Sequence, residues 1–461
     1  MSFENRICGE CVSDGYLRDQ IRSSAEQSLE CDYCGIRHPT IELNALAEQC
    51  DVAIERFYEA SSLSDDVVIH DRTPKGEPLN EVLQRLLGGS EQLREDIAIL
   101  LGEIWFDRDS MESRYGEDPW FVEATTHPEV LSAAWRQMEH RLQHEARLVN
   151  PAVAAVLEEV FGSLLNYQTR DGTPVLVEAG PGCEWNTFFR ARVFQTLKEL
   201  EDALSHPERN LGAPPEGTGP AGRMNCAGVS VFYGAGDRMT TLSEVRPPVG
   251  SHVAVGEFKV IRSLRLLNLD SLAAIDPALG GSRFDPATQA KVERGQFLKT
   301  LNRMMTMPVM PELEHRDYLI TQAIADFLAT HAVLKLDGII FPSAQHLPPT
   351  QQGPHSLQPQ HRNVILFSKA ANVLRAGPAP RPLYGVQLFE YEGDTACFAP
   401  QISSSDVPAV GTAELSSQGT PNEPSLELNT ATIEIHEIRA VEFTTASHRV
   451  FQHLPRDRPL V

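Results

Sequence analysis

The spacing of hydrophobic positions divides the chain near residue 170 into a helical part and a part that alternates strands with helices. Apolar side chains recur every three to four residues over 78–106 and again over 128–167. Within the second stretch, Asn150 followed by Pro151 is typical of the start of a new helix. These patterns predict that residues 51–170 form a helical domain.

Short apolar runs of strand character begin after residue 171. They are found at 174–179, 229–233, 252–261, 338–341 and 363–368. A helical pattern over 312–336 lies among them, and a last β-like run covers 430–445 beyond a proline-rich stretch. The chain therefore predicts an α+β fold, with a mixed α/β unit over 171–375 and a β-containing extension over 376–461.

Composition narrows the class of partner. The 461 residues suffice for two to four domains, and 63 acidic against 40 basic side chains give a net charge of −23. This charge repels phosphate backbones and anionic lipid surfaces, so we expect neither nucleic acid nor a membrane as partner. No apolar run approaches the ~20 residues of a membrane span, and the first residues lack a signal-peptide layout. We therefore expect a cytoplasmic protein.

The first fifty residues hold two Cys-x-x-Cys pairs, formed by Cys8 with Cys11 and by Cys31 with Cys34. Each pair can direct two thiolates at one ion, and four thiolates complete a tetrahedral zinc site. In a reducing cytosol, zinc fits this spacing better than four unrelated thiols or a redox pair. Residues 1–50 are therefore predicted to form a zinc-ribbon-like head whose zinc is structural, because no coordination position stays open for water.

Other common motifs do not carry chemistry here. His140 and His144 stand four apart on a predicted helix, but no HExxH pattern or third ligand accompanies them. The glycines at 178–185 and 233–238 do not form a dinucleotide-binding fingerprint, and neither a Walker A motif nor a GxSxG elbow occurs.

The remaining candidate chemistry lies at predicted strand ends after residue 188. Arg223 stands in GRMNCAGVSVFY, Tyr233 closes that run, Glu244 follows eleven residues later, and Ser343 lies just past the short apolar strand of DGIIFPSAQ. Arginine grips a diphosphate, tyrosine stacks on a flat ring, and a carboxylate stabilises a developing positive charge. The same residues would also suit a surface ion pair, a core tyrosine and a turn serine. The residues alone leave both interpretations open.

These motifs, together with TTLSEVRP, resemble the successive signatures of RES-domain proteins over about 185–370. The amino-terminal half resembles the cysteine-containing helical extension of longer RES proteins, which is related to the HEPN fold. The resemblance implies a core like that of ADP-ribosyltransferase toxins and an enzyme that destroys NAD by phosphorolysis or hydrolysis, as a toxin or defence effector. The implied domains are a zinc-binding head, a HEPN-like helical domain, a RES catalytic domain and a C-terminal extension, at 1–50, 51–170, 171–375 and 376–461.

The resemblance also implies a role for each signature residue. Arg223 would hold the NAD phosphates, and Tyr233 would stack on the nicotinamide. Glu244 would stabilise the ribosyl cation, while Ser343 would bond the ribose or orient Glu244. No general acid is needed, because nicotinamide leaves as a neutral ring.

Three further residues belong to the implied ligand site. Arg190 and Arg192, in FFRAR, are alternative candidates for binding the pyrophosphate or an incoming phosphate, and Asn225 would support the turn that carries Arg223. The acceptor stays open among phosphate, water and a macromolecular side chain, the last defining a mono-ADP-ribosyltransferase. A non-catalytic zinc-bearing scaffold is the alternative outside enzymes. Shorter RES toxins pair with an antitoxin, so an antitoxin or regulatory protein is a candidate partner.

Overall fold

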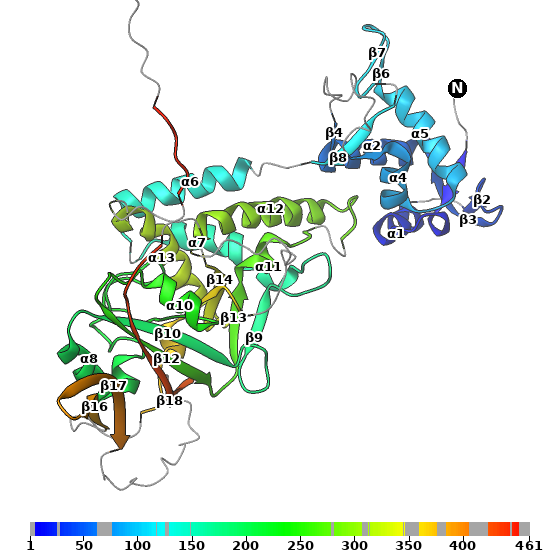
Figure 1. Ribbon diagram of the computed structural model, residues 1–461. Coiled ribbons are helices and arrows are strands. Elements are labelled where there is room, and N and C mark those ends of the chain that lie inside the picture. Colours follow the sequence, from blue (N-terminus) through cyan, green and yellow to red (C-terminus); the bar gives the residue numbers. More distant parts are fainter. Residues whose placement is uncertain are drawn as a thin grey trace, which may run out of the picture.

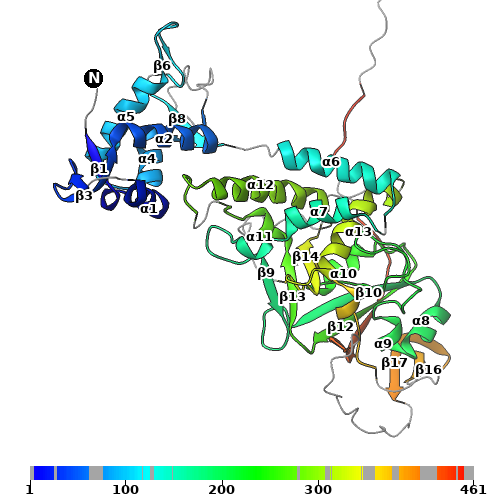
Figure 2. The same ribbon diagram turned by 180° about the vertical axis from the view of Figure 1, so that it is seen from behind.

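The computed structural model describes most of the chain in fourteen segments. These are residues 5–24, 28–61, 76–116, 118–124, 129–147, 149–277, 281–306, 312, 314–343, 345, 359–375, 384–404, 423–442 and 445–450. A smaller lobe built from the first 124 residues lies beside a larger body that contains the main sheet (Figures 1 and 2). No helix among the described residues is long and apolar enough to cross a membrane.

The amino-terminal lobe, described over residues 5–124 apart from 25–27, 62–75 and 117, combines small sheets with helices around its own core. Its cysteine-bearing sheet has the order β1 (Arg6–Cys8), β3 (Arg37–Glu42), β2 (Ser28–Glu30). The helices are α1 (Gly15–Ser24), α2 (Leu43–Phe57), α4 (Leu79–Leu87) and α5 (Glu91–Trp105). The small strands are β4 (Tyr58–Ala60), β5 (Glu77–Pro78), β6 (Phe106–Asp107), β7 (Glu112–Ser113) and β8 (Trp120–Glu123).

One continuous core joins the cysteine region to these helices. It runs from Ile7 and Cys31 through Leu46 and Leu83 to Phe121, all buried. The helical pattern predicted over 78–106 is confirmed as α4 and α5, and Ser90 caps α5 by accepting a 3.2 Å hydrogen bond from Leu93 N. Residues 1–50 and the start of the predicted helical domain therefore share one hydrophobic core.

Four longer helices form a layer against the sheet of the larger body, and we call them the helical layer. They are α6 (Glu129–His144), α7 (Pro151–Phe161), α12 (Pro286–Thr306) and α13 (Glu314–Thr330). Asn150 caps α7 through a 3.3 Å bond from Val153 N, with Pro151 at the first position, as the sequence predicts. Buried side chains of α6 and α7 belong to the same hydrophobic core as those of α12, α13 and the sheet. These two helices therefore pack with the larger body.

The central sheet has eight strands in the order β18-β12-β10-β11-β15-β14-β13-β9. Its strands are β9 (Leu176–Ala179), β10 (Thr187–Phe194), β11 (Phe232–Ala235), β12 (His252–Val260), β13 (Leu264–Asn268), β14 (Gly338–Pro342), β15 (Arg362–Leu366) and β18 (Leu426–Glu437). Only β13 and β14 pair in parallel among these described strands, and the other pairs are antiparallel. The predicted α+β class is confirmed. The hydrophobic patterns left β10, β13 and the long helix α12 unpredicted.

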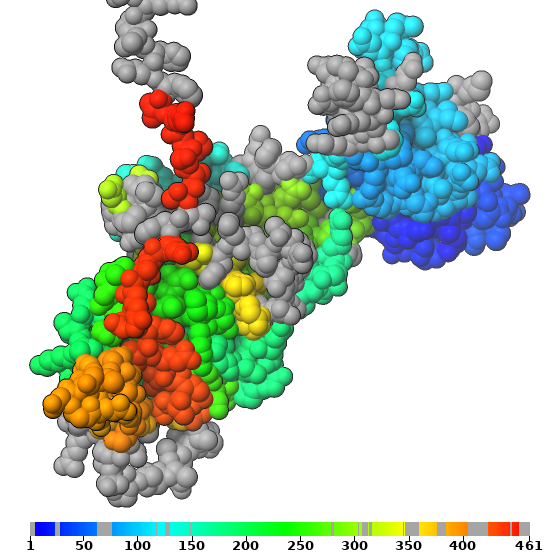
Figure 3. All heavy atoms as spheres, viewed as in Figure 1, coloured from blue at the N-terminus to red at the C-terminus, as the bar shows by residue number. Residues whose placement is uncertain are grey.

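The second face of the sheet is covered by smaller elements. These are α8 (Leu197–Leu204), α9 (Pro207–Asn210) and a hairpin of β16 (Tyr384–Glu392) and β17 (Thr395–Ser404), while α10 (Arg238–Glu244) and α11 (Leu269–Ala273) lie near the strand ends. Figure 3 shows the hairpin, in orange, and β18, in red-orange, against the green sheet domain. Because β18 pairs with β12 along its length, the carboxy-terminal residues complete the central sheet.

Candidate active site

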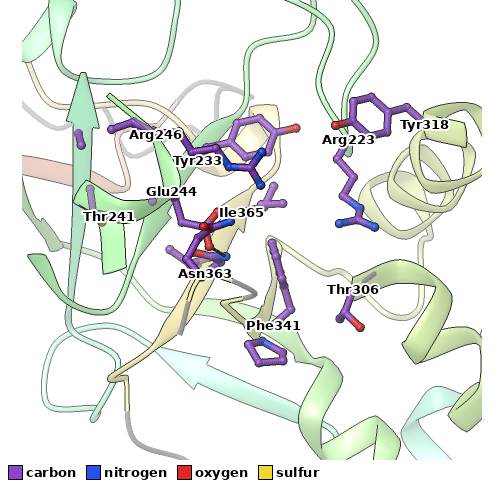
Figure 4. A pocket seen from close by; sticks show the side chains of 16 residues that line it. Arg223, Tyr233, Thr241, Glu244, Arg246, Thr306, Tyr318, Phe341, Asn363 and Ile365 are labelled. Atoms are coloured by element: carbon purple, nitrogen blue, oxygen red, sulfur yellow. Dashed lines mark hydrogen bonds between the residues drawn. The ribbon is translucent and has the colours of Figure 1, made fainter. Parts of the chain in front are cut away.

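A cavity of about 380 Å³ opens where four strands of the sheet meet the helical layer (Figure 4). It is lined by residues from β10, β11, β14, β15, α10, α12 and α13, together with the turn before β11. The polar lining residues that the argument uses are Arg223, Tyr233, Thr241, Glu244, Arg246, Thr306, Tyr318, Gln345 and Asn363. Three of the four predicted catalytic residues line the cavity, and the fourth, Ser343, contacts one of them.

Helix α10 places Glu244 at the cavity wall. Asp237 caps this helix by accepting bonds from Thr240 N at 2.8 Å and from the Thr240 hydroxyl at 2.7 Å. The second carboxylate oxygen of Asp237 also accepts a 2.8 Å bond from His361 N, next to β15. Thr241 ties the helix to β10 through a 3.0 Å bond to the Phe189 carbonyl. This anchoring sets the direction in which the last residue of the helix points.

The Glu244 carboxylate is held by two buried donors, one directly after β14 and one on β15. Ser343 Oγ donates to Glu244 Oε1 at 2.5 Å, and Asn363 Nδ2 donates to the same oxygen at 2.8 Å. Ser343 also accepts a 3.2 Å bond from Gln345 N, which orients its hydroxyl proton toward Glu244. Both donors act on Oε1, so Oε2 is the carboxylate oxygen left to act on a ligand.

Arg223 reaches the cavity from a tight turn that Asn225 and Gln322 hold together. Gln322 Nε2 donates to the carbonyls of Gly222 and Asn225 at 2.8 and 3.0 Å, and Thr321 Oγ1 donates to the Arg223 carbonyl at 2.5 Å. Asn225 Nδ2 bonds the carbonyls of three neighbouring residues at 2.9–3.1 Å. Burial lowers the pKa of Arg223, but an arginine stays charged at neutral pH.

The turn and Tyr233 fit closely around Gly222. Tyr233 OH donates to Asn225 Oδ1 at 2.7 Å and accepts a 3.0 Å bond from Met224 N. A Cβ at Gly222 would lie 2.6 Å from Tyr233 OH, so a larger residue would displace the tyrosine. Burial raises the pKa of Tyr233 to about 12, and the phenol is therefore neutral at physiological pH.

Arg190 and Arg192 lie on the other face of the sheet. Successive side chains of a strand alternate between faces, and Ala191, between the two arginines, is the β10 residue that lines the cavity. Arg190 donates to the Tyr233 carbonyl at 3.1 Å and stacks 5.3 Å from the Phe232 ring, and burial lowers its pKa to about 10. Arg192 bonds the Asn210 carbonyl. The structure thus does not bring these two predicted candidates into the cavity.

Sequence reasoning missed several polar residues of the cavity. Asn363 lies inside a strand predicted from its apolar pattern, and only its register opposite Phe341 of β14 reveals its place beside Glu244. Arg246 follows α10 with a φ of 44°, a left-handed conformation that is uncommon for a side chain other than glycine. Arg223 and Arg246 approach the cavity from different elements on either side of it (Figure 4). Tyr318 enters from α13, far along the chain.

The four predicted zinc ligands do converge. The sulfur atoms of Cys8, Cys11, Cys31 and Cys34 all lie within 4.8 Å of one another, and the Cys8–Cys11, Cys8–Cys34 and Cys11–Cys31 separations are 3.7, 3.7 and 3.8 Å. Four thiolates about 2.3 Å from one zinc in a tetrahedron would be about 3.8 Å apart. The donor set and its spacing therefore fit a structural zinc ion.

The fold and the cavity define a mixed α/β domain whose cavity is lined by two arginines, two tyrosines and a carboxylate held by two hydrogen bonds. Residues 187–386 match the family model of the RES domain, so the chain contains a RES domain over that range. The RES family is associated with enzymes that act on NAD. No curated protein matches the chain, and no solved structure matches it.

Proposed function

We propose that this protein cleaves the bond between nicotinamide and ribose in NAD and transfers the ADP-ribosyl group to phosphate or water. The observation that carries the proposal is the Glu244 carboxylate, clamped by Ser343 and Asn363 at the wall of a cavity into which Arg223 also reaches. The RES match over 187–386 supports the same class of substrate.

The reaction needs charge stabilisation more than proton transfer. When the glycosidic C–N bond breaks, its electron pair goes to the pyridinium nitrogen, so nicotinamide leaves as a neutral molecule. The positive charge moves to the ribose, which becomes oxocarbenium-like. A fixed carboxylate beside that ribose stabilises the transition state more than the ground state. Glu244 Oε2 would supply this charge, while Oε1 stays occupied by its two donors.

The two cavity arginines suit the diphosphate of NAD. Arg223 projects from a turn fixed by Gln322 and Thr321, and Arg246 projects from the end of α10, two residues after Glu244. Guanidinium groups bind phosphate oxygens in a bidentate manner, and two of them can hold one diphosphate. We therefore propose Arg246 as a second diphosphate ligand beside Arg223.

Tyr233 would hold the nicotinamide ring. Its hydroxyl is engaged by Asn225 and Met224 N, so the ring is held firmly and the face that lines the cavity has a fixed orientation. An aromatic ring fixed in this way offers a flat surface for stacking on another ring. The high pKa of Tyr233 keeps the phenol uncharged during turnover.

Product analysis tests the proposal directly. The purified protein is incubated with NAD in phosphate buffer and in phosphate-free buffer, and the products are identified by mass spectrometry. ADP-ribose-1″-phosphate indicates phosphorolysis and free ADP-ribose indicates hydrolysis, either of which supports the proposal. ADP-ribose attached to a protein would identify a mono-ADP-ribosyltransferase instead. NAD that stays intact under all conditions contradicts an NAD-consuming activity and favours a scaffold.

We also propose that the amino-terminal lobe binds one structural zinc ion through Cys8, Cys11, Cys31 and Cys34. The zinc would link β1 to the turn after β2, and Ile7 and Cys31 belong to the core of the whole lobe. Loss of the ion would therefore loosen this lobe, whereas the cavity around Glu244 is built from other elements.

A further inference from the structure

A second cavity, of about 290 Å³, lies at the junction between the amino-terminal lobe and the larger body. We call it the junction cavity. The lobe contributes residues from the end of α2 and from β8, and the larger body contributes α12 and the segments around Arg170 and Asp276. Its lining is Phe57, Glu123, Ala124, Arg170, Ala274, Ile275, Asp276, Pro277, Arg283, Val292, Gln296 and Lys299.

The junction cavity carries three cationic side chains and two carboxylates. The carboxylates already have partners: Glu123 accepts from Arg283 at 2.7 Å and from Arg85 at 3.3 Å. Asp276 lies 3.7 Å from the Arg170 guanidinium. Arg283 is further fixed because it stacks over aromatic rings of the lobe and bonds the hydroxyl of one of them. The described lining therefore has one more positive than negative side chain.

Lys299 supplies this excess charge. It lies on α12, is partly buried, and burial lowers its pKa. Within the described parts of the chain, its ammonium has no hydrogen bond and no carboxylate within ion-pairing distance, since Asp276 and Glu123 act on it only at longer range. An ammonium removed from water without a partner is unfavourable, and an anion placed beside it would restore the lost interaction.

We propose that the junction cavity binds a small molecule that carries a phosphate group. Lys299 would contact the phosphate from α12, and Arg170 would contact it too, because its side chain is 79% exposed and, among the described residues, its ion-pair partner Asp276 lies at a long distance of 3.7 Å. A phosphate group of charge near −2 would neutralise the ammonium of Lys299. It would also share the guanidinium of Arg170 with Asp276. The volume of about 290 Å³ suits a small phosphate ester and is smaller than the cavity at Glu244.

The same helix leads from the junction cavity to the active-site cavity. Val292, Gln296 and Lys299 of α12 line the first cavity, and Thr306, at the end of α12, lines the second. Thr306 follows Lys299 by seven positions, which span about 10 Å of helix. Gln296 also donates to the Ala124 carbonyl of the lobe at 3.3 Å. A phosphate compound held by Lys299 would therefore contact the same helix whose end lines the site at Glu244.

Binding of glycerol 3-phosphate, followed by calorimetry at constant ionic strength, tests the site, with glycerol as the uncharged control. Lys299→Gln keeps a polar side chain but removes the charge, and loss of a charged hydrogen bond of about 1.5–3 kcal/mol should weaken binding about 10- to 100-fold. Lys198→Gln, an exposed lysine on α8, is the matched control and should bind like the unmodified protein. Arg170→Gln should also weaken binding without a risk to the core.

Two results would overturn the proposal. One is no detectable binding of glycerol 3-phosphate, and the other is equal affinity in the unmodified protein and both cavity variants. Coupling to the active site rests on the proposed function and is measured separately, as a change in the KM for NAD on addition of glycerol 3-phosphate that Lys299→Gln abolishes. Binding with an unchanged KM refutes the coupling alone, and binding in a protein that never consumes NAD leaves the site standing while the proposed function fails.

Discussion

Replacement of Glu244 by Gln isolates the negative charge in the proposed mechanism. Gln has the shape of Glu, and its carbonyl oxygen can accept the same two bonds from Ser343 Oγ and Asn363 Nδ2 that Glu244 Oε1 accepts at 2.5 and 2.8 Å. The cavity should therefore keep its architecture. What the variant lacks is a charge beside the ribose, which matters mainly when the ribose becomes positive.

The size of the effect follows from electrostatics. A carboxylate about 4 Å from a full positive charge contributes about 4 kcal/mol at an effective dielectric constant of about 20. Each 1.36 kcal/mol changes the rate about tenfold, so loss of the charge should lower kcat by about 10³. Removal of one preorganised electrostatic group typically lowers the rate by about 10²–10³. We therefore expect a fall in kcat of at least about 100-fold with a much smaller change in KM.

Steady-state kinetics of nicotinamide release measure this effect. Glu184→Gln is the matched control, because Glu184 is exposed and lies outside the cavity lining, and it should retain the native kcat. Circular dichroism and thermal unfolding of both variants verify the fold. A folded Glu244→Gln protein that consumes NAD at the native rate would refute the assignment of Glu244.

Further variants test the other parts of the site and the lobe. Arg223→Ala should raise the KM for NAD, because it removes a diphosphate contact that already exists in the ground state, and an unchanged KM would contradict that role. Ser343→Ala removes one of the two bonds to Glu244, so kcat should fall about tenfold or more; native kinetics would show that Asn363 alone is sufficient. Burial raises the pKa of Tyr233 from 10.0 to about 12, so its contribution to stability is complete below about pH 10 and is lost as the pH rises toward 12. Between pH 10 and 12, the free energy of unfolding measured with denaturant should therefore fall less in Tyr233→Phe than in the unmodified protein. An equal fall in both proteins would contradict this. Cys31→Ser should release zinc, measured by elemental analysis, and increase proteolysis of the lobe while NAD turnover persists; native protein that holds no zinc after purification without chelator would disprove the metal site.

Local patterns were sufficient for many elements of the fold. The helical spacing over 78–106 corresponds to α4 and α5, and Asn150-Pro151 begins α7 as predicted. Five apolar runs correspond to β9, β11, β12, β14 and β15. These elements are recognisable because burial of one face imposes a local period on the sequence, and burial of both faces gives a continuous apolar run. Strand β10 was not predicted as a strand because its arginines at positions 190 and 192 interrupt the apolar character of that run.

The cores could not be read from the sequence in the same way. The helical stretches before residue 170 look alike in composition, yet α2, α4 and α5 pack in the amino-terminal lobe, whereas α6 and α7 pack with α12 and α13. Likewise, β18 belongs to the central sheet although more than eighty residues separate it from β14. Which apolar faces meet depends on contacts between distant segments, and a local pattern carries no information about the partner.

For the site, the sequence by itself determined the chemical types and their motifs: the two cysteine pairs, and Arg223, Tyr233 and Glu244 at recognisable intervals. Only the tertiary structure decided which residues share one cavity. It placed Asn363 and Ser343 on one oxygen of Glu244, because β14 and β15 pair in a register that no local spacing encodes. It also directed Arg190 and Arg192 away from the cavity, because strand alternation sends them to the face opposite Ala191. The identity of each residue sets the chemistry that is possible. The register of the strands, and the face of the sheet to which each side chain points, set which groups act together.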